Sequence, residues 1–234
     1  MADHADQSYV PTDRRPIAAR AWPIWVRAAK SLAQRGVSPN GISLAGMGFG
    51  VAAGAALAAT TYASGFERVA WLAGAVFIQL RLLANLLDGM VAIESGRASP
   101  LGELYNEVPD RVSDTATLIG AGLAVGGEST LGYLAACVAM FTAYVRATGK
   151  AAGVAQEFCG PMAKQQRMAL LTAIAVYCGV APLAWQPAWQ PGWSNAKFGL
   201  ASAALLVIVS GGLLTAMRRL LRITANLKNK RSEP

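Results

Sequence analysis

Six long apolar stretches, separated by short polar segments, occupy most of the chain after residue 38. They cover about residues 40 to 61, 69 to 93, 101 to 125, 129 to 148, 167 to 185 and 198 to 221. A transmembrane α-helix needs roughly 20 predominantly apolar residues to cross the hydrocarbon core. The pattern therefore predicts an all-α, polytopic membrane protein with about six transmembrane helices.

The segment before the first apolar stretch mixes aromatic and basic residues at short spacing. Its members are Arg20, Trp22, Trp25, Val26, Arg27 and Lys30. This composition predicts an amphipathic helix that lies on the membrane surface, with a helix on a soluble surface as the alternative. Residues 1–38 lack a signal-peptide pattern and are predicted to form a cytoplasmic tail that ends in this segment. Residues 39–222 then form the six-helix domain, and residues 223–234 a basic cytoplasmic tail.

Basic residues gather on one side of the predicted membrane. When loops are assigned alternately to the two sides, one side has only Arg68 and Lys197, and the other has Arg14, Arg15, Arg20, Arg27, Lys30, Arg35, Arg97, Arg146, Lys150, Lys164, Arg167, Arg218, Arg219, Arg222, Lys228, Lys230 and Arg231. The positive-inside rule predicts that both termini face the cytoplasm, in a cell (inner) membrane. Although the net charge is +8, these residues mark membrane topology rather than a nucleic-acid surface.

Polar and charged residues interrupt the second and third apolar stretches. Asn85 and Asp88 are spaced i, i+3, and Asn106 and Asp110 are spaced i, i+4, so each pair projects from one helix face. A charge at a helix centre costs about 2.5 to 3.5 kcal/mol on insertion scales, which indicates a polar cavity. Two facing pairs would offer oxygen ligands to a hard divalent cation. The alternative is that the acids pair with Arg81 and Arg111 or line a proton path.

The segment that connects these two stretches predicts a sharply defined helix start. Ser99 followed by Pro100 resembles an N-cap with proline at the first helical position. Further along, Pro109 cannot donate to the carbonyl of Tyr105 and is predicted to kink the helix beside Asp110.

The spacing of these residues resembles the signature of the CDP-alcohol phosphotransferase family. That signature is Asp, two residues, Asp-Gly, two residues, Ala-Arg, eight residues, Gly, three residues, Asp, three residues, Asp. This chain has identical spacing at Asn85, Asp88, Gly89, Ala92, Ile93, Gly102, Asn106 and Asp110. The resemblance extends to the Pro39-Asn40 start of the first stretch and to the basic segments around Arg146 and Arg167, and so covers roughly residues 30 to 221.

The resemblance implies an enzyme that transfers the phosphatidyl group of a CDP-activated lipid, such as CDP-diacylglycerol, to a hydroxyl acceptor with release of CMP. It implies Mg²⁺ or Mn²⁺ held by Asp88, Asp110, Asn85 and Asn106, with Asp110 also the catalytic general base. The nucleotide would lie against Gly89, Ala92, Gly102 and Asn40. Phosphate groups, including those of a phosphorylated acceptor, would meet Arg146, Lys150, Lys164 and Arg167. Homodimers are common in the family.

The chain departs from the signature at three positions. Asn85 and Asn106 replace aspartates, and Ile93 replaces the arginine. An amide oxygen still coordinates hard cations but brings no charge, so divalent metal should bind more weakly or in smaller number. Glu107 and Asp114 are candidate compensating carboxylates. Two other functions remain open, which are a relative that binds nucleotide or lipid without turnover and a small membrane transporter.

Overall fold

The computed structural model describes residues 18–190, 192 and 198–231. Within these residues the regular secondary structure is helical, apart from one isolated bridge between Trp189 and Phe198, and loops connect the helices. In chain order the helices are η1 (Ala18–Ala21), α1 (Pro23–Gln34), α2 (Pro39–Ala59), α3 (Glu67–Glu94), α4 (Pro100–Leu123), α5 (Ser129–Ala151), α6 (Lys164–Val180), η2 (Leu183–Trp185) and α7 (Leu200–Arg231). The all-α fold and the helical amphipathic segment are confirmed, and α2 to α7 correspond to the six predicted stretches.

Four of these helices, α2, α3, α5 and α7, are long and apolar enough to cross a membrane. The other two long helices of the bundle, α4 and α6, differ from these four in composition or in length. Charged residues, among them Glu107, Asp110, Arg111 and Asp114, interrupt the apolar sequence of α4, and α6 has only 17 residues. The prediction that the fifth span reaches residue 185 is wrong, because Ala181 is already extended and Pro182 disfavours a helical residue before it.

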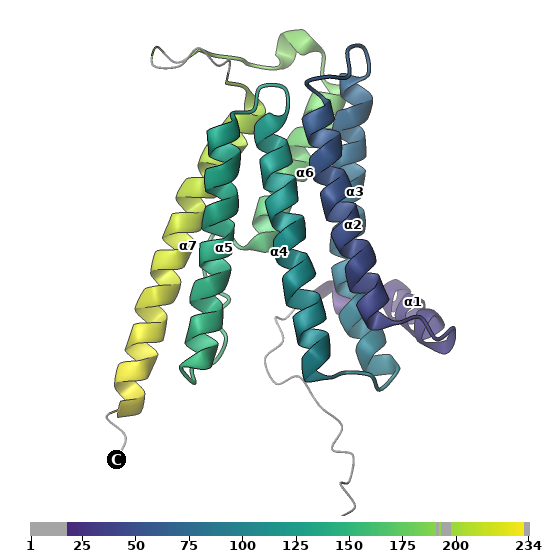
Figure 1. Cartoon of the computed structure of the whole chain (residues 1–234), viewed down its shortest axis with the longest axis vertical. Coiled ribbons are helices and arrows are strands. Elements are labelled where there is room, and N and C mark those ends of the chain that lie inside the picture. Colours follow the sequence, from purple (N-terminus) through teal and green to yellow (C-terminus); the bar gives the residue numbers. More distant parts are fainter. Residues whose placement is uncertain (1–17, 191, 193–197, 232–234) are drawn as a thin grey trace, which may run out of the picture.

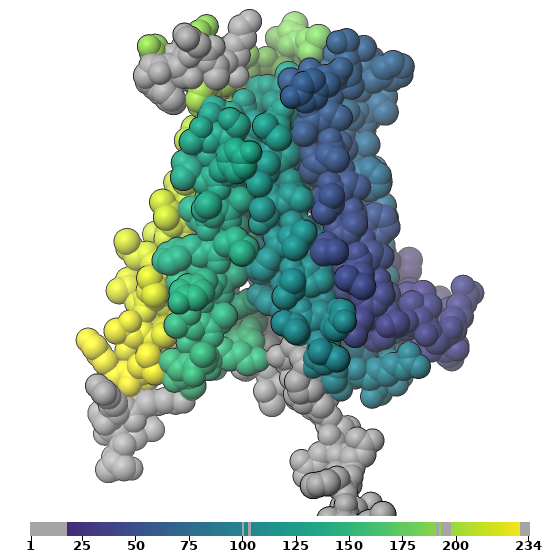
Figure 2. Space-filling model, viewed as in Figure 1, coloured from purple at the N-terminus to yellow at the C-terminus, as the bar shows by residue number. Residues whose placement is uncertain are grey.

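The six long helices stand side by side in one bundle, with α1 projecting from its base (Figure 1). The loop between α3 and α4, the loop between α5 and α6, and the end of α7 lie at this same end. The predicted basic loops and the amphipathic helix therefore share one end of the molecule. Figure 2 shows α2, α4 and α5 packed closely along the upper part of this face, with α1 extending sideways below.

Glycine residues allow α2 and α4 to approach within backbone contact. A Cβ atom at Gly54 would lie 2.2 Å from the carbonyl oxygen of Ala116, and one at Gly120 would lie 2.1 Å from the carbonyl oxygen of Gly54. Thr117 crosses the same contact by donating its hydroxyl to the carbonyl of Gly50 at 3.2 Å. Since α3 also packs against α2, this contact fixes the distance between the two helices that carry the signature.

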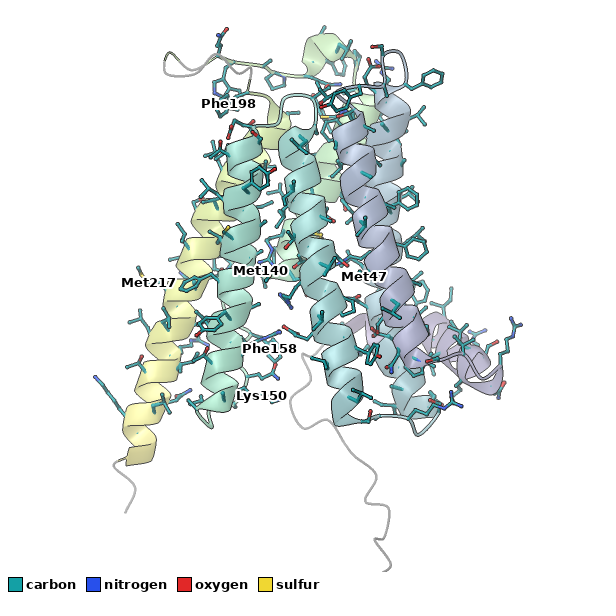
Figure 3. The ribbon with its side chains drawn as sticks, in the orientation of Figure 1. Met47, Met140, Lys150, Phe158, Phe198 and Met217 are labelled. Atoms are coloured by element: carbon teal, nitrogen blue, oxygen red, sulfur yellow. The ribbon has the colours of Figure 1, made fainter. Side chains whose placement is uncertain are left out.

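The main buried apolar core joins α2, α3, α4, α5, α6 and α7, and Val145, Val154 and Ile223 form a small second apolar cluster. Fully buried members include Leu57, Ile78, Leu118, Met168 and Leu205. Towards the base, several buried positions are taken by charged side chains, among them the groups that form the site. Figure 3 shows Phe158 inside this lower part and Lys150 nearer the base.

Candidate active site

The signature aspartate of α3 is held by neutral hydrogen-bond donors. Asp88 is 3% exposed, and its Oδ2 accepts from the hydroxyl of Ser43 on α2 at 2.7 Å. Its Oδ1 accepts from the backbone N–H of Gly89 at 2.5 Å. Asp88 therefore sits between α2 and α3 as a buried carboxylate with two short neutral contacts.

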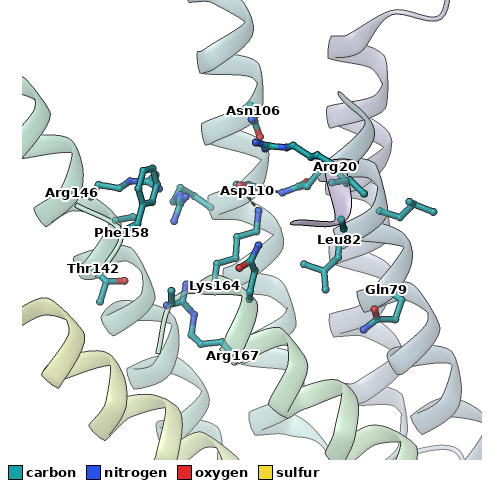
Figure 4. A pocket seen from close by; sticks show the side chains of 18 of the residues that line it. Arg20, Gln79, Leu82, Asn106, Asp110, Thr142, Arg146, Phe158, Lys164 and Arg167 are labelled. Atoms are coloured by element: carbon teal, nitrogen blue, oxygen red, sulfur yellow. Dashed lines mark hydrogen bonds and ion pairs between the residues drawn. The ribbon is translucent and has the colours of Figure 1, made fainter. Parts of the chain in front are cut away.

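The signature aspartate of α4 is instead surrounded by donors from two other helices. Asn85 on α3 donates its side-chain N–H to Oδ1 of Asp110. Lys164, the first residue of α6, forms an ion pair with Oδ2 of Asp110 and points toward it (Figure 4). Arg81 adds a contact to Oδ1 at 3.5 Å and donates to the backbone carbonyl of Asp110 at 3.3 Å. Both carboxylate oxygens of Asp110 thus have partners.

One helical turn further along α4, Asp114 forms a fully buried ion-pair network. Its Oδ1 pairs with Arg81 and its Oδ2 pairs with Arg167 on α6 at 3.0 Å. All three side chains are 3% exposed or less. Both Asp110 and Asp114 therefore pair with Arg81, as the alternative interpretation of the sequence predicted.

At the mouth of the site, Glu107 links α4 to α5. Its carboxylate accepts two hydrogen bonds from Arg146, at 2.7 and 2.8 Å, and pairs with Arg111 at 2.9 Å. Arg146 also lies 5.7 Å from the ring centre of Phe158. Both candidate compensating carboxylates, Glu107 and Asp114, are therefore engaged by arginines.

These elements surround a cavity of about 510 Å³ at the basic end of the bundle (Figure 4). Among its described lining residues, one is acidic, Asp110, whereas the basic ones are Arg20, Arg111, Arg146, Lys164, Arg167 and Arg219. Asn85 and Asn106 line it as well. The cavity therefore combines one carboxylate with a strongly cationic wall, which suits an anionic ligand.

Several residues of this cavity were not predicted from the sequence. Arg20 and Trp25 come from the amphipathic segment, Phe158 from the loop before α6, and Arg219 from α7. Arg219 donates to the carbonyl of Thr142 at 2.8 Å and to that of Cys159 at 3.1 Å, so it ties the loop to α5. Arg219 lies near the end of an apolar stretch, and from the sequence it was interpreted only as a marker of membrane topology.

The residues that resemble the family's nucleotide site do not line this cavity. Gly89, Ala92, Gly102 and Asn40 are absent from the described lining, and so is Lys150. Gly102 donates its backbone N–H to the hydroxyl of Ser99 at 3.1 Å, which confirms the predicted N-cap of α4. The helix continues through Pro109, and the kink stays a prediction.

The predicted divalent-metal site is incompletely formed by these contacts. In the part of the chain that the structure describes, no three His, Cys, Asp or Glu residues converge on one point. The hydrogen-bond donors to Asp88 are the neutral groups of Ser43 and Gly89. The oxygens of Asp110 instead face an amide N–H and two cationic groups. The donor set at Asp110 therefore does not fit a divalent cation, and among the four predicted ligands Asp88 alone keeps a carboxylate suited to one.

The fold resembles solved structures of one enzyme. Phosphatidylinositol phosphate synthase of Mycobacterium tuberculosis with CDP-DAG bound superposes with a TM-score of 0.67 at 20% identity, over 86% of this chain and 94% of that chain. The same protein in complex with manganese and citrate gives a TM-score of 0.65 at 20% identity, over 85% and 88% of the two chains. At this identity the likeness concerns the fold.

Sequence comparisons identify relatives with related names. The chain is 27% identical over 207 residues to phosphatidylinositol phosphate synthase of Streptomyces avermitilis, covering 83% of this chain and 75% of that protein. It is 35% identical over 128 residues to archaetidylinositol phosphate synthase of Aeropyrum pernix, covering 54% and 62%. A family model described as CDP-alcohol phosphatidyltransferase matches residues 37–214. This match spans most of the chain and all of the signature, and the protein is therefore a member of the CDP-alcohol phosphatidyltransferase family.

Proposed function

We propose that this enzyme transfers the phosphatidyl group of CDP-diacylglycerol to a phosphorylated polyol and releases CMP. The observation that carries the proposal is the cavity in which Asp110 faces a wall of arginine and lysine side chains. Such a wall matches an acceptor with its own phosphate group, because bidentate and charge-assisted hydrogen bonds recognise phosphate. The relatives named as inositol phosphate lipid synthases support an acceptor of the inositol phosphate class.

In the proposed reaction, a hydroxyl oxygen of the acceptor attacks the phosphorus atom that bears the diacylglycerol. The hydroxyl proton passes to a carboxylate oxygen of Asp110, and the P–O bond of the anhydride breaks, so that CMP leaves with the bridging oxygen. Arg146 and Arg167, which both line the cavity, would hold the phosphate of the acceptor. Family membership favours this chemistry over a transporter that uses the same buried acids.

The nucleotide is proposed to lie outside the cationic cavity, against Gly89, Ala92, Gly102 and Asn40. Support comes from their absence from the cationic cavity, which leaves that cavity to the acceptor. We propose that Mg²⁺ or Mn²⁺ is bound from Asp88, with Asn85 and Asn106 as neutral oxygen ligands; when bound, such an ion neutralises charge on the pyrophosphate.

The acceptor class is tested by measuring CMP release with pairs of alcohols that differ only by a phosphate group. With CDP-diacylglycerol in mixed micelles, inositol phosphate is expected to support turnover, whereas inositol should support little. Equal rates with the two would contradict a cavity that recognises phosphate.

Arg146→Gln is expected to raise the KM for the phosphorylated acceptor by about 10- to 100-fold, because one charge-assisted interaction is lost. The KM for CDP-diacylglycerol should change little, since Arg146 lies on the acceptor side of the site. Arg97→Gln, which removes the same charge from an exposed loop residue, is the matched control. Equal effects on both substrates would assign Arg146 a general structural role.

We also propose that the basic end of the bundle faces the cytoplasm. This orientation rests on the one-sided distribution of Lys and Arg and on α1 lying at the same end. In a variant without native cysteines, single cysteines near residues 10 and 230 are expected to resist an impermeant thiol reagent in intact cells. Labelling of both from outside would reverse the orientation.

A further inference from the structure

Asp110 is paired with a cation of the protein itself, Lys164, which is not part of the family signature. The Lys164 ammonium group pairs with Oδ2, and the amide N–H of Asn85 occupies Oδ1. Arg81 contacts the same Oδ1 at 3.5 Å from a fully buried position. A divalent ion bound to Asp110 would have to displace these groups or lie against a positive charge.

The charges of the surrounding cluster are already balanced. The basic members are Arg81, Lys164 and Arg167, and the carboxylates are Asp88, Asp110 and Asp114. The two signs are therefore equal in number, with Asp110 and Asp114 in ion pairs and Asp88 held nearby by neutral donors. Aspartates at positions 85 and 106, as in the family signature, would leave an excess of two negative charges, which is the charge that one divalent cation neutralises.

Lys164 is the cation of this cluster that is placed to govern access to Asp110. Its side chain is 20% exposed and lines the cavity, whereas Arg81 is fully buried and is fixed by Asp114. Figure 4 shows Lys164 extending from α6 to Asp110 across the cavity wall. Asn85 supports the arrangement, because an amide can donate to Asp110 where an ionised aspartate would repel it.

We propose that Lys164 takes the place of a divalent cation at Asp110, so that this chain binds divalent metal without using Asp110. Two changes then belong together. Asn85 and Asn106 remove two carboxylates from the signature, and the Lys164 ammonium supplies a positive charge that a metal ion would otherwise supply. The inference concerns the same site as the proposed function, but it is tested by metal binding alone, so either can fail without the other.

The test is a Mn²⁺ titration of the purified full-length protein, followed by electron paramagnetic resonance of the free ion. Lys164→Gln is expected to bind Mn²⁺ with a Kd lower by about tenfold or more, because the competing cation is gone. Lys164→Arg, which keeps the charge, and Lys30→Gln, which removes the same charge from α1, should both match the wild type. The gain in Lys164→Gln should disappear when Asp110→Asn is added.

An unchanged Kd and stoichiometry in folded Lys164→Gln would overturn the proposal, as would a gain that persists in the double variant. If Lys164→Gln does not fold, wild type and Asp110→Asn are compared directly. The proposal expects the same Mn²⁺ binding in both, and loss of a bound ion in Asp110→Asn would overturn it.

Discussion

Asp110→Asn is expected to lower the rate of CMP release by about 10²- to 10⁴-fold, the usual cost of losing a positioned general base. Asp110 is the acidic residue among the described cavity-lining residues, and its carboxylate faces the cationic wall that would hold the acceptor. Asparagine keeps the size of the side chain but cannot take a proton. Binding of CDP, measured by calorimetry, should persist, because the nucleotide is proposed to lie outside the cationic cavity.

Glu94→Gln provides the matched control, since it removes an exposed carboxylate at the end of α3 and should leave turnover unchanged. Near wild-type turnover in folded Asp110→Asn would eliminate Asp110 as the base. Glu107 and Asp114 would then be the remaining carboxylates of α4 near the cavity.

Asp114→Asn is expected to destabilise the protein by about 3 to 5 kcal/mol, as removal of one partner from a buried ion pair typically does. Asp114 is 2% exposed and is paired with both Arg81 and Arg167. Without its charge, Arg81 keeps only the contacts to Asp110, and Arg167 keeps a hydrogen bond to the carbonyl of Met162 at 3.1 Å. Two guanidinium groups would then be buried with insufficient negative charge.

The loss is measured as a shift in the unfolding midpoint of the detergent-solubilised protein. The double variant Asp114→Asn with Arg81→Met should recover part of the stability, because it also removes one of the unpaired charges. A loss below about 1 kcal/mol in Asp114→Asn would show that the network contributes as little as an exposed ion pair.

The helices were predictable because each depends on a local pattern. Apolar length located α2 to α7, and Ser99 with Pro100 located the start of α4. The end of α6 was missed because Pro182 stops the helix although apolar residues continue beyond it. The helical continuation of α7 to Arg231 was missed because polar residues that leave the bilayer can remain helical without an apolar signal.

The site was predictable only within single helices. Spacing placed Asn85 with Asp88 and Asn106 with Asp110, but it could not determine which cation meets which acid. One partner of Asp110, Lys164, comes from α6, and Arg219 reaches the loop at Cys159 from α7. Such contacts join residues more than 50 positions apart, and they depend on helix packing that no local pattern encodes.

The most direct test follows labelled phosphate through the reaction. CDP-diacylglycerol labelled at the phosphorus atom that bears the diacylglycerol is incubated with the purified protein, Mg²⁺ or Mn²⁺ and inositol phosphate. The account predicts that the label moves into a new phospholipid that also contains the acceptor, while unlabelled CMP is released in equal amount. Label that stays in CDP-diacylglycerol, or that appears in phosphatidic acid by hydrolysis, would contradict transfer to a phosphorylated acceptor.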